Sequence, residues 1–213
     1  MTDVHCHVGG GDRSVREFTD RFAGVHPWEA ERWNAEAERA LDARLTHDRS
    51  LGVGEIGLDR LRTRTISAGQ RTAFRAQLAL AARLRRPAVL HGAKCWGEVV
   101  KTIREVEREA GRAPAFLFHG FSRSPGLVPE IAALGGFISV GPAILNGHAV
   151  NYRELVRTIP DAMLLVETDR TEANAATCPG VGEVLGALAE VRGVAVTALE
   201  ALTDSNADRF LMV

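Results

Sequence analysis

Short apolar runs alternate with helical patterns along the whole chain. Strand-like runs begin near residues 3, 21, 52, 87, 114, 137 and 163. Between these runs, apolar residues recur at helical intervals, as in the stretch that carries Phe74, Leu78 and Ala81. Such alternation is typical of parallel strands joined by helical crossovers. The pattern therefore predicts an α/β fold with about seven parallel strands.

The expected helices are bounded by recognisable residues. One helix is expected from about Trp28 to Asp48, because Pro27 suits a first turn and apolar residues follow at four-residue spacing, namely Trp33, Ala37, Leu41 and Leu45. A later helix is expected to end near Gly111, which can adopt the left-handed conformation of a C-cap. Two further helices, over about residues 181–191 and 197–211, are expected to close the chain.

The length of the chain limits the barrel that it can form. A complete (β/α) barrel of eight units usually needs about 250 residues, and this chain has 213. The residues between His7 and Arg21 are too few for a helix, a strand and a second helix. We therefore expect a reduced or distorted TIM-like (β/α) barrel in a single domain over residues 1–213, with residues 9–20 as an irregular crossing. An open sheet edge at this crossing would let a second copy pair there, so a monomer or a weak homodimer is expected.

Composition and charge exclude some classes of protein. The formal net charge is −1, so there is no global basic field for nucleic acid, and any recognition of anions must be local. The three cysteines, Cys6, Cys95 and Cys178, match neither a disulfide framework nor a zinc-finger spacing. Neither a signal peptide nor an apolar run of about 18 residues is visible. We expect a cytoplasmic protein that does not contact membranes.

Histidines and carboxylates gather where the strand-like runs end. His5 and His7 are two residues apart, so both imidazoles point to the same face of a strand. Later runs end at Glu55, His91, His119 and Asp169. One pair of histidines near a terminus would equally suit a loosely held tail, but the repetition in chain order favours a site. Functional groups of (β/α) barrels lie at the carboxyl ends of the strands, so we expect these six residues to share one metal site.

The mixture of ligands indicates which ions would bind. Imidazoles with carboxylates suit zinc, manganese, nickel or iron better than an all-oxygen magnesium site, but the identity of the ion stays open among these five metals. One or two divalent ions are expected. A bridging Glu55 would hold two ions about 3.5–4 Å apart, an arrangement that clamps the attacking and leaving oxygens in phosphoester hydrolysis.

The motifs resemble those of the TatD-like metal-dependent hydrolases, a branch of the amidohydrolase-type barrels. In the family's order, they are Asp3-Val4-His5-Cys6-His7, Gly24-Val25-His26-Pro27, Gly54-Glu55-Ile56-Gly57-Leu58-Asp59, Val89-Leu90-His91, Phe118-His119-Gly120-Phe121-Ser122 and Val166-Glu167-Thr168-Asp169. The resemblance implies a hydrolase with a one- or two-metal centre, often described as a deoxyribonuclease. It also implies that the first metal is bound by His5, His7, Glu55 and Asp169, and the second by Glu55, His91 and His119.

Two departures from the family pattern concern the substrate. Trp28 stands where the family usually has a second histidine, and Arg170 follows Asp169 where a proline is normally close by. Shortened members of the family do resemble this chain, including a lysine after the third of these strands, here Lys94. The resemblance therefore implies the metal ligands but leaves the substrate open.

Positive side chains also follow the strands. They are Arg60, Arg62, Arg64, Lys94, Arg123 and Arg170. A phosphate-bearing substrate would use such cations, whereas solvated arginines that balance the carboxylates of the site are the alternative. From this set we assign Arg60, Lys94 and Arg123 to substrate binding, together with His26.

Three functions remain open from the sequence. The leading hypothesis is a metal-dependent phosphoesterase with deoxyribonuclease-like activity, which uses a metal-bound hydroxide on a small phosphoester or on the 3′ end of a nucleic acid. Asp169 would be both ligand and proton acceptor, and Glu55 the second catalytic carboxylate. The alternative is hydrolysis of a carboxylic ester or an amide. A non-enzymatic metal-binding scaffold is disfavoured because every expected ligand is present.

Overall fold

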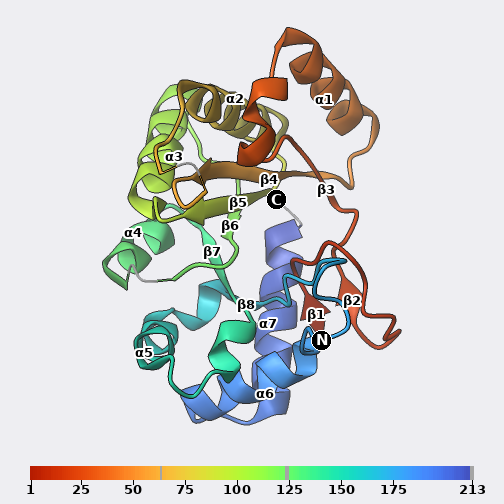
Figure 1. Cartoon of the computed structure of the whole chain (residues 1–213), viewed down its shortest axis with the longest axis vertical. Coiled ribbons are helices and arrows are strands. Elements are labelled where there is room, and N and C mark those ends of the chain that lie inside the picture. The colour runs from red at the N-terminus through yellow and green to blue at the C-terminus, as the bar shows by residue number, and fades with distance from the viewer. Residues whose placement is uncertain (63, 123–124, 212–213) are drawn as a thin grey trace. The chain divides into compact units, whose positions relative to one another are not determined.

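The structure is a computed structural model that describes residues 1–62, 64–122 and 125–211. Short strands alternate with helices along the chain (Figure 1). The strands are β1 (Thr2–Asp3), β2 (Arg16–Glu17), β3 (Phe22–Ala23), β4 (Gly52–Asp59), β5 (Ala88–Ala93), β6 (Phe116–Phe118), β7 (Phe137–Val140) and β8 (Leu164–Val166). The α-helices are α1 (Ala35–His47), α2 (Ala68–Leu84), α3 (Trp96–Ala110), α4 (Val128–Ala133), α5 (Val150–Thr158), α6 (Val181–Arg192) and α7 (Val196–Leu211). Short 3₁₀ helices are η1 (Pro27–Arg32), η2 (Pro125–Leu127), η3 (Pro142–Leu145) and η4 (Asp161–Met163).

The strands form parallel sheets. The larger sheet has six parallel strands that follow the sequence order from β3 to β8, and β1 pairs in parallel with β2. The expected α/β class with a parallel sheet is thus confirmed. The expected count of seven strands was wrong, because β2 lies inside the stretch that we expected to be an irregular crossing. A two-residue strand is shorter than any periodic pattern, so no pattern in the sequence predicts it.

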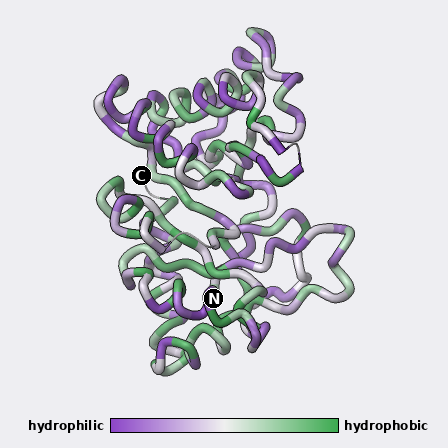
Figure 2. Tube along the Cα trace, turned by 60° about the vertical axis from the view of Figure 1, so that its left-hand side comes forward, coloured by the Kyte–Doolittle hydropathy of each residue, from purple (hydrophilic) through white to green (hydrophobic). Residues whose placement is uncertain are grey.

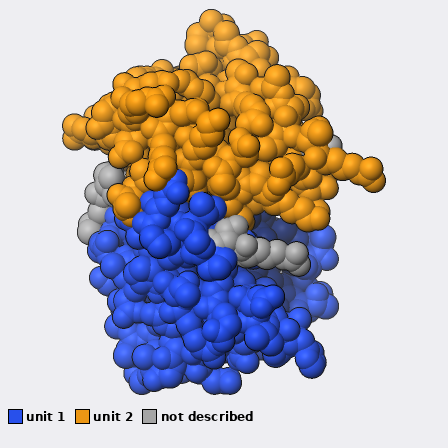
Figure 3. Space-filling model, turned by 90° about the vertical axis from the view of Figure 1, so that its left-hand side faces the viewer, with its two compact units in different colours: residues 1–20, 119–132, 137–212 blue, residues 21–118, 133–136, 213 orange. Residues whose placement is uncertain are grey.

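The chain folds into two compact units, which Figure 3 colours separately. Unit 1 contains residues 1–20, 119–132 and 137–212, and unit 2 contains residues 21–118 and 133–136. Each unit has its own set of buried apolar side chains. The expectation of a single domain over residues 1–213 stays a prediction.

Unit 2 is built around β4, which pairs with β3 on one side and β5 on the other. Seven of the eight residues of β4 are buried, the pattern of a strand that is covered on both faces. Helix α2 packs on β4 and on α3. Its apolar face contains Phe74, Leu78 and Ala81, all buried, as the periodicity predicted. Apolar and polar colours alternate along the helices in Figure 2, as expected for helices with one buried face.

The helix expected over residues 28–48 is divided. The 3₁₀ helix η1 ends at Arg32, and α1 begins only at Ala35. Asn34 separates them because its side-chain Oδ1 accepts hydrogen bonds from the N–H groups of Glu36 and Ala37, at 2.9 and 3.0 Å. Asparagine is a strong N-cap, so the second helix starts here. The apolar side chains keep their four-residue spacing on both sides of Asn34, so the pattern did not predict the break.

Unit 1 is built around the pair β7 and β8, in which every residue is buried. Helices α6 and α7 pack on β8 and on each other. The side chain of Asn206 on α7 donates hydrogen bonds to the carbonyl oxygens of Asp161 and Leu164, at 2.7 and 2.8 Å. Helices α6 and α7 begin and end within one residue of the predicted bounds. Among the described residues, no helix is both long and apolar enough to cross a membrane.

Candidate metal centre

Unit 1 brings together three of the expected ligands. One ligand atom each from His5, His119 and Asp169 lies within 4.8 Å of the others. The His5 and His119 rings are 4.3 Å apart between centroids. Nε2 of His5 lies 3.6 Å from Oδ1 of Asp169, and Nε2 of His7 lies 3.5 Å from the same oxygen. Four of the six expected ligands therefore face one another within this unit.

Asp3 holds the histidine-bearing segment against the segment that carries Asp169. Its buried carboxylate accepts hydrogen bonds from the backbone N–H and the hydroxyl of Thr168, at 3.0 and 2.6 Å. The N–H of His5 donates to the same carboxylate at 3.3 Å, and the N–H of Asp169 donates to the carbonyl of His5 at 3.0 Å. Burial raises the pKa of Asp3, although the bonds from Thr168 oppose this. The buried carboxylate of Asp3 thus joins the segments that carry the expected ligands His5 and Asp169.

Asp169 and Glu167 differ sharply in surroundings although they are two residues apart. Asp169 has a φ of 49°, in the left-handed region that aspartate tolerates better than most residues. Glu167 is 1% exposed and accepts hydrogen bonds from the N–H of Gly120 and the hydroxyl of Ser139, at 2.7 and 2.5 Å. Burial raises the pKa of Glu167 to about 7. The Asp169 carboxylate is therefore partly exposed, whereas the Glu167 carboxylate is buried.

Unit 2 contains a second group of possible ligands, formed by His26, Glu55 and His91. Nδ1 of His91 lies 2.7 Å from Oε1 of Glu55, and Nε2 of His26 lies 3.3 Å from the same oxygen. The sequence analysis placed Glu55 and His91 at the ends of their strands. The structure places them within β4 and β5. Strand β4 continues past Glu55 to Asp59.

Asp59 fixes the ring of His91 from the other side. Its carboxylate is 2% exposed, and Oδ2 lies 3.2 Å from Nε2 of His91. The indole N–H of Trp28 donates to the same oxygen at 2.6 Å. Although burial works in the opposite direction, the hydrogen bonds from the Arg62 N–H, from Trp28 and from His91 hold the pKa of Asp59 below its usual value. Asp59 thus lies behind His91, as carboxylates do behind metal-binding histidines.

Two carboxylates act on the pKa of His91. Burial lowers its pKa, but the hydrogen bond to Glu55 and the contact with Asp59 outweigh burial, so the pKa of His91 is raised. Because Asp59 takes Nε2, the nitrogen left for an ion beside Glu55 is Nδ1.

The nitrogens of His26 have separate partners. Its Nδ1 accepts a hydrogen bond from the backbone N–H of Trp28 at 3.2 Å, which caps η1. A ring nitrogen that accepts a hydrogen bond carries no proton, so the neutral ring carries its proton on Nε2, toward Glu55. The assignment of His26 to substrate binding stays a prediction.

Helix α2 positions this group through two buried glutamines. The side chain of Gln77 accepts from the N–H of Val25 at 2.6 Å and donates to the carbonyl of Val25 at 3.1 Å, next to His26. Gln70 accepts from the N–H of Asp59 at 3.0 Å. Sequence analysis missed these residues, as it missed the roles of Asp3, Asp59 and Glu167. The available signal was a polar residue at a buried position of an otherwise apolar face.

The residues of both groups fit a divalent ion. With metal–ligand bonds of about 2.0–2.2 Å, ligand atoms around one ion lie roughly 3–4.5 Å apart. Each group has its ligand atoms within 4.8 Å of one another and combines imidazole with carboxylate. Such donors suit zinc and similar metals. The common site of all six expected ligands, with Glu55 as a bridge, stays a prediction.

Two of the three expected substrate-binding cations lie beside the unit 2 group. Arg60 follows β4, and Lys94 follows β5; both side chains are exposed. The guanidinium of Arg60 donates to the carbonyl of Lys94 at 2.7 Å, which joins the two loops. Arg123 lies outside the described residues.

Solved structures share the fold of this chain. The chain aligns with YJJV, a TatD homologue from Escherichia coli, with a TM-score of 0.76 and 23% sequence identity, over 95% of this chain and 79% of that one. A TatD family hydrolase from Entamoeba histolytica aligns with a TM-score of 0.72 and 16% identity, over 92% of this chain and 75% of that one. The predicted fold class is therefore confirmed.

Sequence comparison identifies the family. A protein from Edwardsiella piscicida named 3'-5' ssDNA/RNA exonuclease TatD is 34% identical over 72% of this chain, a match that spans 58% of that relative. A protein of the same name from Klebsiella pneumoniae is 31% identical over 86% of this chain and 73% of its own length. The profile of the family described as "TatD related DNase" matches residues 12–212. The chain therefore belongs to the TatD-related DNase family, as its motifs predicted.

Proposed function

We propose that the chain is a metal-dependent phosphodiesterase that removes nucleotides from the 3′ end of single-stranded nucleic acid. The observation that carries this proposal is the pair of compact imidazole and carboxylate groups, one in each unit. The names of the Edwardsiella and Klebsiella relatives support the choice of substrate. The cations that follow β4 and β5 support a substrate that bears phosphate.

In this proposal, each unit holds an ion through its own residues. His5, His119 and Asp169 would hold one ion, with His7 adjacent, and Glu55 with His91 would hold another. When bound, such an ion supplies positive charge that acidifies a water molecule and stabilises the negative charge of the phosphoryl group. The identity and the number of the ions stay open.

The protein's own groups have distinct parts in the reaction. Asp169 accepts the proton of the attacking water through a carboxylate oxygen. His26 donates a hydrogen bond from Nε2 to a phosphoryl oxygen. Arg60 and Lys94 bind charge that is already present on the substrate, so they contribute to affinity more than to turnover.

Metal-dependent hydrolysis of three substrates would test the proposal. Protein stripped with chelator and reloaded separately with zinc, manganese or magnesium would be assayed on a 5′-labelled single-stranded oligonucleotide, on bis(p-nitrophenyl) phosphate and on p-nitrophenyl acetate. We expect stepwise shortening of the oligonucleotide, which keeps its 5′ label, and cleavage of the small phosphodiester, both only with added metal. Cleavage of the acetate alone would favour the carboxylic ester or amide alternative. Metal binding without any turnover would favour the scaffold alternative.

A second copy of the oligonucleotide, labelled identically but blocked at its 3′ end, would test the direction of the reaction. Mononucleotide release from the open end only is expected. Equal release from both oligonucleotides would contradict the 3′-end part of the proposal. A cytoplasmic location and a monomeric or weakly dimeric state stay predictions.

A further inference from the structure

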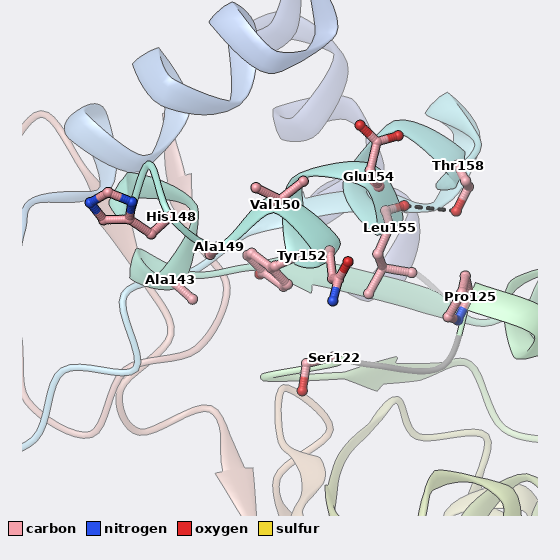
Figure 4. A pocket seen from close by; sticks show the side chains of 11 residues that line it. Ser122, Pro125, Ala143, His148, Ala149, Val150, Tyr152, Glu154, Leu155 and Thr158 are labelled. Atoms are coloured by element: carbon pink, nitrogen blue, oxygen red, sulfur yellow. Dashed lines mark hydrogen bonds between the residues drawn. The ribbon is translucent and has the colours of Figure 1, made fainter.

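Two adjoining hollows lie in unit 1 beside Asp169. The smaller, of about 460 Å³, is lined by Asp169 itself together with residues of the loops after β7 and β8. The larger, of about 900 Å³, is lined mainly by η3, the loop after it and α5 (Figure 4). The two hollows share Ser122, Ala143 and Tyr152 as lining residues. A ligand that reaches Asp169 can therefore continue into the larger hollow.

The described lining of the larger hollow combines apolar and polar groups. Apolar surface comes from Ala149, Val150 and Leu155, and groups that form hydrogen bonds come from Asn151, His148 and Ser122. Glu154 is the one charged lining residue among those described, and neither hollow has a described lysine or arginine in its lining. The carboxylate of Glu154 repels a phosphate group, so this part of the lining favours an uncharged part of a nucleotide. It suits a flat, uncharged ring with polar edges.

Tyr152 has a fixed position between the hollows. Its hydroxyl oxygen accepts a hydrogen bond from the N–H of Gly141 at 3.2 Å. Burial raises the pKa of Tyr152, so its hydroxyl stays protonated. An aromatic ring held in this way offers a nucleobase a stacking surface that does not discriminate among bases.

We propose that the larger hollow binds the nucleoside part, base and sugar, of the nucleotide next to the phosphodiester presented to Asp169. This inference rests on the proposed function and names the subsite that it needs. A volume of about 900 Å³ is within the range of about 300–1,000 Å³ that is usual for small-molecule sites. The subsite would distinguish a nucleic acid from a small phosphoester that has no nucleoside.

Ala143→Trp would test the subsite because Ala143 is exposed, lines both hollows and lies in η3. The measured quantity is kcat/KM for the single-stranded oligonucleotide divided by kcat/KM for the same oligonucleotide with abasic sugars at its two 3′-terminal positions. We expect this ratio to fall about tenfold or more, because the indole occupies the place of a stacked base. Ala162→Trp is the matched control, since Ala162 is an exposed alanine of another 3₁₀ helix and lines neither hollow. The ratio of the control should stay within about twofold of the original.

Asn151→Ala provides a second test that does not depend on the fit of an added ring. Asn151 is exposed on α5, where alanine is favourable, so the variant should fold. We expect the same ratio to fall several-fold. An unchanged ratio in both variants would overturn the proposal.

Oligonucleotide binding to the metal-free protein tests the nucleoside subsite separately from the proposed phosphodiesterase activity. Fluorescence anisotropy with a dye-labelled tetranucleotide should show weaker binding by Ala143→Trp than by Ala162→Trp in the presence of chelator. If the original protein cleaves neither phosphodiester but shows this difference, the phosphodiesterase proposal falls and the subsite stands. Equal binding by the two variants would remove the subsite while leaving the activity untouched.

Discussion

The indole N–H of Trp28 donates a 2.6 Å hydrogen bond to Oδ2 of Asp59, an oxygen that also contacts Nε2 of His91. Trp28 stands where the family usually has a histidine. The side chain is half exposed, and the guanidinium of Arg62 lies 4.4 Å above its ring. The tryptophan thus does not provide a further ligand. It supports the carboxylate that contacts His91, an expected ligand.

Asp59→Asn should weaken metal binding by about 10- to 100-fold, the usual effect of losing the group behind a ligating histidine. The amide can still accept the N–H of Trp28 but cannot hold the imidazole with a charge. Calorimetric titration of stripped protein with zinc would measure the change. Asp48→Asn is the control, because Asp48 is a partly exposed aspartate just after α1 whose described side-chain hydrogen bonds go to Ser50. Equal affinities for the two variants would contradict the role of Asp59.

Trp28→Phe should have a smaller effect on metal affinity, of roughly tenfold, because it removes one hydrogen bond to a charged group and keeps an aromatic ring. Trp33→Phe serves as the control, since Trp33 lies just after η1 and contacts neither Asp59 nor His91 in the described network. The same titration applies. A loss for Trp28→Phe that exceeded that of Asp59→Asn would show that Trp28 acts by another route.

Asp169→Asn should nearly abolish turnover of every substrate while the fold is retained, because an amide cannot accept the proton of the attacking water. Asp208→Asn in the same unit is the control, since Asp208 only pairs with Arg16 at the surface. Glu55→Gln should in addition weaken metal binding. Substantial turnover by Asp169→Asn, with circular dichroism unchanged, would exclude Asp169 as proton acceptor.

Arg60→Ala and Lys94→Ala should mainly raise KM for phosphate-bearing substrates and leave kcat within a few-fold, because they bind charge already present in the ground state. Lys101→Ala is the control, as Lys101 is an exposed lysine on α3 away from these loops. Steady-state kinetics on bis(p-nitrophenyl) phosphate would provide both constants. If neither constant changes in Arg60→Ala and Lys94→Ala, the phosphate-recognition part of the proposal is wrong.

Gln77→Leu should lower the free energy of unfolding by about 2–3 kcal/mol, because it leaves the N–H and the carbonyl of Val25 without the partners they have in a buried region. Arg71→Leu on the same helix should cost less than about 1 kcal/mol, since it removes only a surface ion pair with Glu98. Urea denaturation of both variants would measure the difference. Similar midpoints would show that Gln77 is dispensable.

The elements that the sequence predicted well are those whose apolar residues repeat over several turns. Phe74, Leu78 and Ala81 predicted the buried face of α2, and the bounds of α6 and α7 were close to those observed. Features that depend on one local hydrogen bond were missed. Asn34 ends the apolar stripe of residues 28–48 by capping α1, and β2 is too short to show a period.

The candidate metal centre was likewise predicted only in part. Ligand types and their order along the chain were visible in the motifs, and so were candidates for substrate binding. The partners of those ligands were not, because a buried polar residue such as Asp3 or Gln77 is recognised only once its hydrogen bonds to distant backbone groups are known. Glu55 and His91 showed a related difficulty, since both lie within their strands and not at the strand ends.

The two glutamines of α2 have a consequence for how this chain can change in length. Gln70 and Gln77 are separated by roughly two helical turns, so they share one face of the helix and hold the backbone of Asp59 and of Val25 together. An insertion or deletion of a single residue between them would rotate one glutamine by about 100° away from its strand. Natural variation in length should therefore be excluded from this stretch of α2.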